Sequence, residues 1–148
     1  MANYAENRKV RFDYEILGKY EVGIELLGME VKSIRNGKMS LEGAFVIIRG
    51  GEAFLINANI PPYQPNNVLK DYDLLRNRKL LMTKKEIATL AGSEKNKSLT
   101  IVPISVYNKG RKIKVEIALV KGKKKQDKRE SIKKREIDRE IRREYKGH

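Results

Sequence analysis

The sequence has no cysteine, and its one histidine is His148, the last of 148 residues. The absence of cysteine excludes disulfide bonds and thiolate metal sites. A single histidine excludes catalytic triads built on histidine and metal sites that need several histidines. Walker loops, glycine-rich dinucleotide loops and metal-ligand clusters are also missing. The sequence therefore indicates a protein that is not an enzyme and that uses no cofactor and no metal.

Long apolar runs are missing as well. No stretch approaches the roughly 18 apolar residues of a membrane-spanning helix. The first residues, MANYAENRK, lack the apolar segment of a secretory signal. These absences, with the lack of cysteine, favour a cytoplasmic location. The length suits a single domain of about 120 residues followed by a tail.

Positive charge dominates the composition. Lys and Arg number 33 against 19 Asp and Glu, which gives a net charge of +14. Half of this excess lies in the last 28 residues, 121–148, which hold thirteen basic and six acidic side chains. Such a protein is expected to bind an anionic partner, and nucleic acid is the commonest one. A membrane surface is the weaker alternative, because this basic tail has no Trp, Phe or Leu.

The basic tail, residues 121–148, has the pattern of a helix that does not fold alone. Asp127 and Glu130 form a D-x-x-E pair that suits a helix start. One thin apolar stripe buries too little surface to offset an ordering cost of about 1–2 kcal/mol per residue. We expect a tail that is disordered when free and helical on an anion; a solvated helix docked on the body, or a solubilising tail, is the alternative. The stripe consists of Ile132, Ile137, Ile141 and Tyr145.

The body, residues 1–120, mixes strand and helix patterns. Helical spacing predicts three short helices: one within 3–17, one over 29–36, and one from a capping box at Thr83 and Glu86 to Gly92. Alternating apolar residues and turn signals predict strands over 20–27, 41–48, 52–58, 99–107 and 112–120.

Glycine and proline mark the connections between these elements. Arg49-Gly50-Gly51 predicts a tight hairpin, and Pro103 predicts an edge or a bulge in its strand. Three prolines interrupt regular structure in a long loop over 59–73. We predict a mainly β protein: an oligonucleotide-binding-like closed antiparallel β-barrel of about six strands with about three short helices, plus the basic C-terminal tail. A β-sandwich is the alternative fold.

Two features indicate a binding surface. The stretch KGKKK at 121–125 directly follows the last strand, and four ammonium groups at one strand end suit phosphate binding. Glu21 faces outward beside Gly23, whose missing side chain leaves the backbone open. Glu21 is therefore a candidate acceptor, although a solvated strand residue is the commoner role of such a glutamate.

Short motifs follow one another in a specific order from Asn7 to Arg129. They are NRK at 7–9, YEI at 14–16, YEVGI at 20–24, GMEVKSIR at 28–35, GK at 37–38, GEAFLI at 51–56, RNRKLL at 76–81, KVE at 114–116, KGKK at 121–124 and DKR at 127–129. Together they resemble the small protein B family, the SsrA-binding proteins of bacterial trans-translation. Residues after Arg129 are similar to that family in composition more than in the identity of individual residues.

The resemblance implies a barrel that grips the tRNA-like domain of transfer-messenger RNA and brings this RNA to stalled ribosomes. It implies a monomer that acts inside a ribonucleoprotein complex, without a membrane. The residues that it assigns to RNA binding are Asn7, Arg8, Glu21, Gly23, Lys79, Leu81, Lys121, Gly122, Lys123 and Lys124. It further implies that the tail becomes helical in the empty messenger channel, on small-subunit ribosomal RNA, through Gln126, Asp127, Lys128, Arg129, Lys133, Lys134, Arg135, Arg139, Arg142 and Arg143.

Two positions depart from the family pattern. Gln126 stands where an aromatic residue or histidine often precedes Asp-Lys-Arg, and glutamine cannot stack as a ring does. Leu74 stands where proline is usual, which loosens the entry to the following segment. Two other functions stay open from the residues alone: a protein that binds folded ribosomal RNA structurally, and a nucleic-acid hydrolase. The absence of cysteine and of any histidine other than His148 disfavours the hydrolase.

Overall fold

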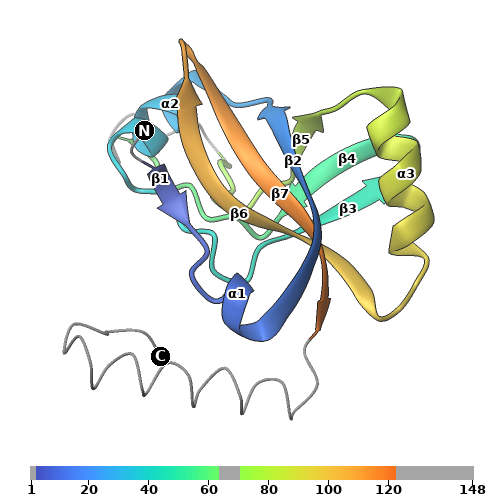
Figure 1. Ribbon diagram of the computed structural model, residues 1–148. Helices are drawn as coiled ribbons and strands as arrows, with labels where there is room; N and C mark the ends of the chain where they lie inside the picture. Colours follow the sequence, from blue (N-terminus) through green and yellow to red (C-terminus); the bar gives the residue numbers. More distant parts are fainter. Residues whose placement is uncertain (1–2, 64–70, 123–148) are drawn as a thin grey trace, which may run out of the picture.

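The computed structural model describes residues 3–63 and 71–122, and they form one mainly antiparallel sheet with three short helices (Figure 1). The strands are β1 (Asn3–Glu6), β2 (Tyr14–Ile24), β3 (Phe45–Arg49), β4 (Glu52–Ile56), β5 (Arg78–Leu81), β6 (Leu99–Lys109) and β7 (Lys112–Gly122). The helices are α1 (Val10–Asp13), α2 (Gly28–Arg35) and α3 (Lys84–Glu94).

Hydrogen bonding between the strands runs in a ring. The sheet order is β1-β6-β3-β4-β5-β2-β7, and β6 also pairs with β7. Six strands therefore return to their starting point, and β1 is attached to β6 outside this ring. The sequence predicted about six strands and gave ranges for five of them. The structure has seven within its described residues, and β1 and β5 are the two for which no range was predicted.

Alternation along β7 shows why these segments are strands. Ile113, Val115 and Ile117 are buried in the central hydrophobic cluster, whereas Lys114 and Glu116 point to the other face. A period of two places all the apolar side chains on one face of a strand. The same pattern had predicted this strand from the sequence, and the prediction is confirmed.

The predicted hairpin and bulge are also confirmed. Arg49 pairs with Glu52 across Gly50 and Gly51, whose φ angles are +59° and +74°. Glycine adopts such positive angles without the steric cost that a side chain adds. The register between β6 and β7 shifts at Pro103, which has no N–H to donate to a ladder.

The prediction of a short helix within 3–17 is confirmed, but this helix is limited to Val10–Asp13. Residues Asn3–Glu6 form β1 on β6, α1 is a single turn, and β2 already begins at Tyr14. The helical spacing arose because Val10 and Tyr14 pack into a second cluster with Val102 on the outer face of the sheet. Tertiary pairing with β6 and β7 decided the conformation here, not local pattern.

The other two helices form as expected, with one change of boundary. Glu30 in the first turn of α2 accepts the Leu27 N–H at 2.8 Å, which satisfies one of the free donors at a helix start. In α3, the Thr83 side chain accepts the Glu86 N–H at 3.1 Å and the Glu86 carboxylate accepts the Thr83 N–H at 3.1 Å. The capping box is confirmed, but α3 continues past Gly92 to Glu94.

The C-terminal boundary lies inside a strand. The prediction placed the end of the body at residue 120, and β7 continues through Lys121 and Gly122, which pair with Glu15 and Tyr14 of β2. Residues 123–148 lie outside the described residues. The conformation predicted for the tail is therefore not tested by the structure.

Candidate nucleic-acid interface

Those residues predicted to bind RNA that the structure describes lie at two ends of the molecule. Strand β2 connects them, because Gly23 pairs with Lys114 near the β6–β7 turn while Tyr14 pairs with Gly122 at the other end of β7. Nine residues of strand separate these two pairs by up to about 30 Å. Figure 1 shows the β6–β7 turn at one extreme of the molecule, and α1 with the end of β7 at the other.

One continuous outer surface, which we call the Glu21 face, spans four neighbouring strands. Its side chains point away from the central cluster, since Val22, Leu80, Val106 and Val115 between them point inward. Four of the predicted residues belong to this face, and the pattern of a single strand could not reveal their neighbours. The face comprises Lys79 and Leu81 of β5, Glu21 and Gly23 of β2, Lys112, Lys114 and Glu116 of β7, and Tyr107 and Lys109 of β6.

The carboxylate of Glu21 is held in place by β6. The Tyr107 hydroxyl donates to one oxygen, and Lys109 Nζ lies 2.8 Å from the other. The hydrogen bond from Lys109, followed by that from Tyr107, lowers the pKa of Glu21 below its ordinary value of 4.5. Burial and the bond to Glu21 raise the pKa of Tyr107. Glu21 is therefore an ionised, oriented acceptor at neutral pH, and Tyr107 and Lys109 are site residues that the sequence analysis missed.

Gly23 and Leu81 are in contact across β2 and β5. A Cβ atom on Gly23 would lie 3.2 Å from the Leu81 Cβ, closer than nine in ten real Cβ contacts. The absence of a side chain at Gly23 thus lets Leu81 lie against the strand, where it stays 49% exposed. Lys79, two residues before Leu81, has its Nζ 3.7 Å from Glu52 Oε1 on the neighbouring strand.

Beside this pair lies a groove of about 280 Å³, which we call the hairpin groove. It is bounded by the end of β2, the end of β5, α2 and the β6–β7 turn. Leu81 and Gly23 form one side, and Arg35 at the end of α2 lies on another. Arg35 Nη2 donates to the Arg111 carbonyl oxygen at 3.2 Å, so α2 is tied directly to the turn.

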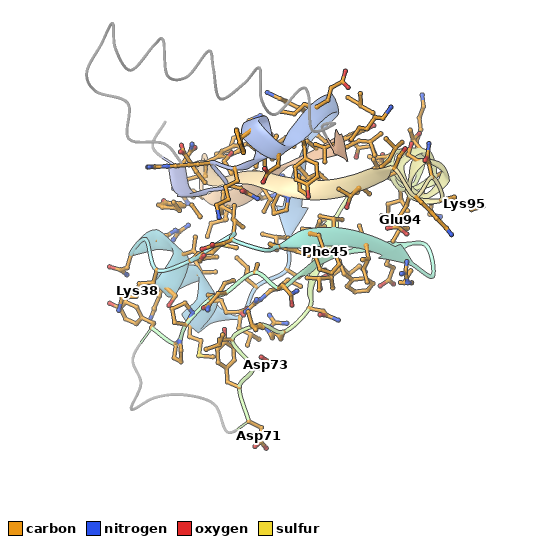
Figure 2. The ribbon with its side chains drawn as sticks, turned by 90° about the horizontal axis from the view of Figure 1, so that it is seen from below. Lys38, Phe45, Asp71, Asp73, Glu94 and Lys95 are labelled. Carbon is orange, nitrogen blue, oxygen red and sulfur yellow. The ribbon has the colours of Figure 1, made fainter. Side chains whose placement is uncertain are left out.

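Asn7, Arg8, Lys121 and Gly122 belong to the other end. The Asn7 N–H donates to the Ile104 carbonyl at 2.7 Å, which fixes the chain between β1 and α1. Arg8 projects into solvent, its side chain 83% exposed. A cavity of about 780 Å³ opens here between α1 and the segment 39–45, whose end at Phe45 is labelled in Figure 2.

Lysines 123 and 124 and the predicted ribosome-binding residues from Gln126 to Arg143 lie outside the described residues. The structure therefore does not test their assignment. The structure does show that β7 ends at this end of the molecule, and that its last two residues, Lys121 and Gly122, are exposed.

A buried ionic cluster lies apart from both ends and was not predicted. Glu30 of α2 and Arg78 of β5 are both fully buried, and Arg78 Nη2 lies 2.6 Å from Glu30 Oε2. Arg76 and the Tyr72 hydroxyl also contact Glu30. Burial raises the pKa of Glu30, but bonds from Arg76, Leu27 N–H and Arg78 outweigh it, so the pKa lies below its ordinary value. The cluster ties the long loop to α2 and has a structural role.

Within residues 3–63 and 71–122, no group of three or more His, Cys, Asp or Glu side chains is placed to hold a metal ion. Over the same part of the chain, no helix has both the length and the apolar character needed to cross a membrane.

Comparison with known proteins gives the family. The model of the SmpB protein family matches residues 4–147, nearly the whole chain. The chain belongs to the SmpB family. The SsrA-binding protein of Enterococcus faecalis is 50% identical over 144 residues, which cover 97% of this chain and 93% of the relative. The SsrA-binding protein of Mesoplasma florum is 53% identical over 142 residues, with 96% and 95% covered.

A solved structure has the same fold and a related sequence. It is described as "tmRNA-SmpB: a journey to the center of the bacterial ribosome", and its matching chain has a TM-score of 0.68 and 42% identity. The match covers 86% of this chain and 92% of that chain. An SmpB chain is a non-enzymatic RNA-binding protein, which agrees with the lack of catalytic groups in the sequence.

Proposed function

We propose that this protein is an adaptor of trans-translation: it binds the tRNA-like domain of transfer-messenger RNA, the SsrA RNA, and delivers it to stalled ribosomes in the cytoplasm. The match of residues 4–147 to the SmpB family, with relatives named SsrA-binding proteins, carries this proposal. The Glu21 face supports it, because an oriented carboxylate beside several lysines suits the donors and phosphates of a folded RNA.

The ring of six strands supports the finer fold proposal, an oligonucleotide-binding-like closed barrel. Each strand of the ring pairs with two neighbours, so no ring strand has a wholly unpaired edge. In such a fold the outer surface of neighbouring strands is available for nucleic acid while the interior is filled by apolar side chains, and the Glu21 face has this position.

We propose that the body and the tail divide the work. The body, with the Glu21 face and the end at Asn7, holds the transfer-messenger RNA. The basic tail from Asp127 onward binds small-subunit ribosomal RNA and detects the absence of messenger RNA from the messenger channel. Nine basic side chains among residues 127–148 suit a segment that becomes ordered on an RNA surface.

The test is binding of the full-length protein to a transfer-messenger RNA acceptor-arm fragment and to an ordinary tRNA across a salt series. We expect a preference for the fragment that persists at moderate salt, because recognition by shape and polar contacts is less salt-dependent than binding by charge alone. Equal binding of both RNAs that disappears as salt rises would contradict the adaptor function.

Two exposed leucines of β2 and β5 provide a matched pair of variants. Leu81 lies on the Glu21 face and Leu17 lies elsewhere on β2, and both are 49% exposed. We expect Leu81→Ala to weaken binding of the fragment by roughly tenfold, the equivalent of about 1.4 kcal/mol, and Leu17→Ala to leave it unchanged. Equal effects of the two substitutions would remove the Glu21 face from the interface.

A further inference from the structure

We propose that the basic tail docks on its own body, in the cavity of about 780 Å³ between α1 and residues 39–45, until the tail binds RNA. We call this cavity the α1 cavity. Of the states that the sequence leaves open for the tail, this is the helix docked on the body. The docked state depends on this chain alone, whereas its role, to keep the tail off RNA before the ribosome is reached, rests on the proposed function.

Strand β7 ends beside the α1 cavity. Its last residue, Gly122, pairs with Tyr14, and Tyr14 lines the cavity. Figure 1 shows α1 and the end of β7 at the same end of the molecule. The apolar stripe of the tail begins at Ile132, ten residues after Gly122. A flexible segment of that length has a mean span of about 16–19 Å, so the stripe begins within reach of the cavity.

The α1 cavity has an apolar lining where the two hydrophobic clusters meet. Five of its lining residues are buried in these clusters, so little further ordering is needed when a side chain is placed on them. The rings of Tyr14 and Phe45 also line it and stay partly exposed. An aliphatic stripe placed against these rings removes apolar surface of both partners from water. The five buried residues are Val10 and Val102 of the second cluster and Met39, Leu41 and Ala44 of the central one.

The charge of the α1 cavity favours a basic peptide over a phosphate. Three acidic residues line it against two basic ones, whereas the hairpin groove at the other end has four basic lining residues and no acidic one. Arg8 Nε lies 4.0 Å from Glu6 Oε2, and Lys9 Nζ lies 3.5 Å from Glu42 Oε1. Such exposed pairs contribute little to stability, so a cation of the tail can replace either one at small cost. The acidic lining residues are Glu6, Asp13 and Glu42.

The tail has both chemical features that the α1 cavity matches. Residues 127–148 hold nine basic and six acidic side chains, so this segment is positively charged. Ile137, Ile141 and Tyr145 recur at intervals of four, which places them on one face of a helix. Attachment to the body favours this occupant over a second copy, because a short linker gives an effective concentration of about millimolar. A contact too weak to hold a free peptide can therefore hold the attached tail.

The docked tail competes with RNA in two ways. It covers Asn7 and Arg8, which line the α1 cavity and which the family resemblance assigns to RNA binding. Its basic side chains also lie on carboxylates and are not available to phosphates. RNA carries a denser negative charge than the three carboxylates of the cavity, so binding to RNA displaces the docked state.

A spin label on the tail of the full-length protein tests the contact. Because the chain has no cysteine, His148→Cys creates a single attachment point at the end of the tail. We expect the label to broaden the NMR signals of Val10 and Val102, which line the α1 cavity, and not those of Leu81 and Ile113 at the hairpin groove. The broadening should decrease as salt rises, since salt screens the charges. Broadening that is absent, or equal at both ends, would overturn the proposal.

Matched variants separate docking from the mere closeness of a tail attached at this end. Glu42 and Glu52 are both exposed, and each lies beside a lysine: 3.5 Å from Lys9 Nζ and 3.7 Å from Lys79 Nζ. Glu42 lines the α1 cavity, whereas Glu52 belongs to β4. In the labelled protein we expect Glu42→Lys to remove most of the broadening at Val102 and Glu52→Lys to leave it unchanged. Equal effects of the two substitutions would refute docking in this cavity.

A mixed sample decides whether one chain or two make the contact. One chain carries the spin label without isotopes, and the other carries the isotopes without the label. We expect no broadening in this mixture. Broadening of the cavity signals there would mean that the tail docks on a second copy, and docking within one chain would be wrong.

The outcomes separate this proposal from the proposed function. If the protein prefers the transfer-messenger RNA fragment but the label broadens no cavity signal, docking is wrong and the adaptor function stands. If the broadening is found without that preference, the adaptor function fails and the contact within the chain stands. Addition of a short RNA duplex should remove the broadening. If the broadening persists with RNA bound, the cavity and RNA do not compete for the tail, and that part of the proposal is wrong.

Discussion

Replacing Glu30 with glutamine removes one negative charge from a site that water does not reach. Arg78 is 0% exposed, and its guanidinium donates from Nε to Glu30 Oε2 at 3.0 Å and from Nη1 to the Ala58 carbonyl at 2.6 Å. In Glu30→Gln the guanidinium keeps its carbonyl acceptors but loses its counter-charge, and the new amide brings a donor next to other donors.

The structure sets the magnitude of this loss. Breaking a buried ion pair by changing one partner costs about 3–5 kcal/mol, because the other charge stays buried without compensation. Surface pairs contribute about 0–1 kcal/mol. Glu42→Gln is the matched control, since the Glu42 side chain is 78% exposed and lies 3.5 Å from Lys9 Nζ. The expected difference between the two variants is therefore about 3 kcal/mol.

Urea unfolding measures this difference. Both variants should unfold with the slope of the wild type, so the shift in midpoint reports the change in the free energy of unfolding. Replacing Glu30 and Arg78 together with methionine should recover part of the loss, because apolar side chains of similar volume need no counter-charge. If Glu30→Gln costs no more than Glu42→Gln, the reasoning is refuted.

The pH dependence gives an independent check with a definite sign. The pKa of Glu30 is lower in the folded protein than its ordinary value of 4.5. Its contribution is therefore fully present above about pH 4.5 and is lost as the pH falls through the folded-state pKa. We expect acid to destabilise the wild type more steeply in this window than Glu30→Gln. Parallel stability curves would show that Glu30 does not carry this effect.

Three further predictions concern other parts of the chain. Thr83→Ala removes the side-chain acceptor of the α3 capping box and should lower the free energy of unfolding by about 1 kcal/mol; no change in the urea midpoint would contradict it. Gly110→Ala places a side chain where φ is +63°, so we expect a loss of about 1 kcal/mol in the same assay, and an unchanged or higher stability would argue against this turn. Tyr107→Phe removes a donor to Glu21 and should raise the pKa of Glu21 toward 4.5 in an NMR titration, without a change of fold; an unchanged value would mean that Lys109 alone orients the carboxylate.

Local signals predicted several elements correctly because their causes lie within a few residues. The capping box at Thr83 and Glu86, the glycine turn after Arg49 and the bulge at Pro103 all depend on neighbouring backbone groups. Regular alternation predicted β7, since the buried residues Ile113, Val115 and Ile117 recur at every second position in its first half.

Strand β5 was missed because its central partners are far away in sequence. Its first residue, Arg78, is fully buried, which contradicts the usual exposure of arginine. Glu30, 48 residues earlier, makes that burial possible by supplying a carboxylate. No window of sequence that contains β5 also contains Glu30, so a local pattern cannot predict this strand.

The residues of the candidate interface also fall into two groups: those that sequence motifs predicted and those that only strand pairing brings to the site. Motifs in the sequence pointed to Glu21, Gly23, Lys79 and Leu81, but not to Tyr107 or Lys109. These two residues reach Glu21 from 86 and 88 positions away, through the pairing of β2, β7 and β6. The hairpin groove likewise exists only because α2 and the β6–β7 turn are brought to the same end of β2.

By itself, the sequence determined the charge, the exclusion of histidine and cysteine chemistry, the turns and caps, and the family of the protein. These properties depend on composition or on contacts a few residues apart. Only the tertiary structure decided that residues 3–6 form a strand and that β7 joins β2 to β6. It also decided that Glu21 is oriented and that α2, the ends of β2 and β5 and the β6–β7 turn bound one groove. Each of these depends on strand pairing over long sequence separations, which local propensity does not encode.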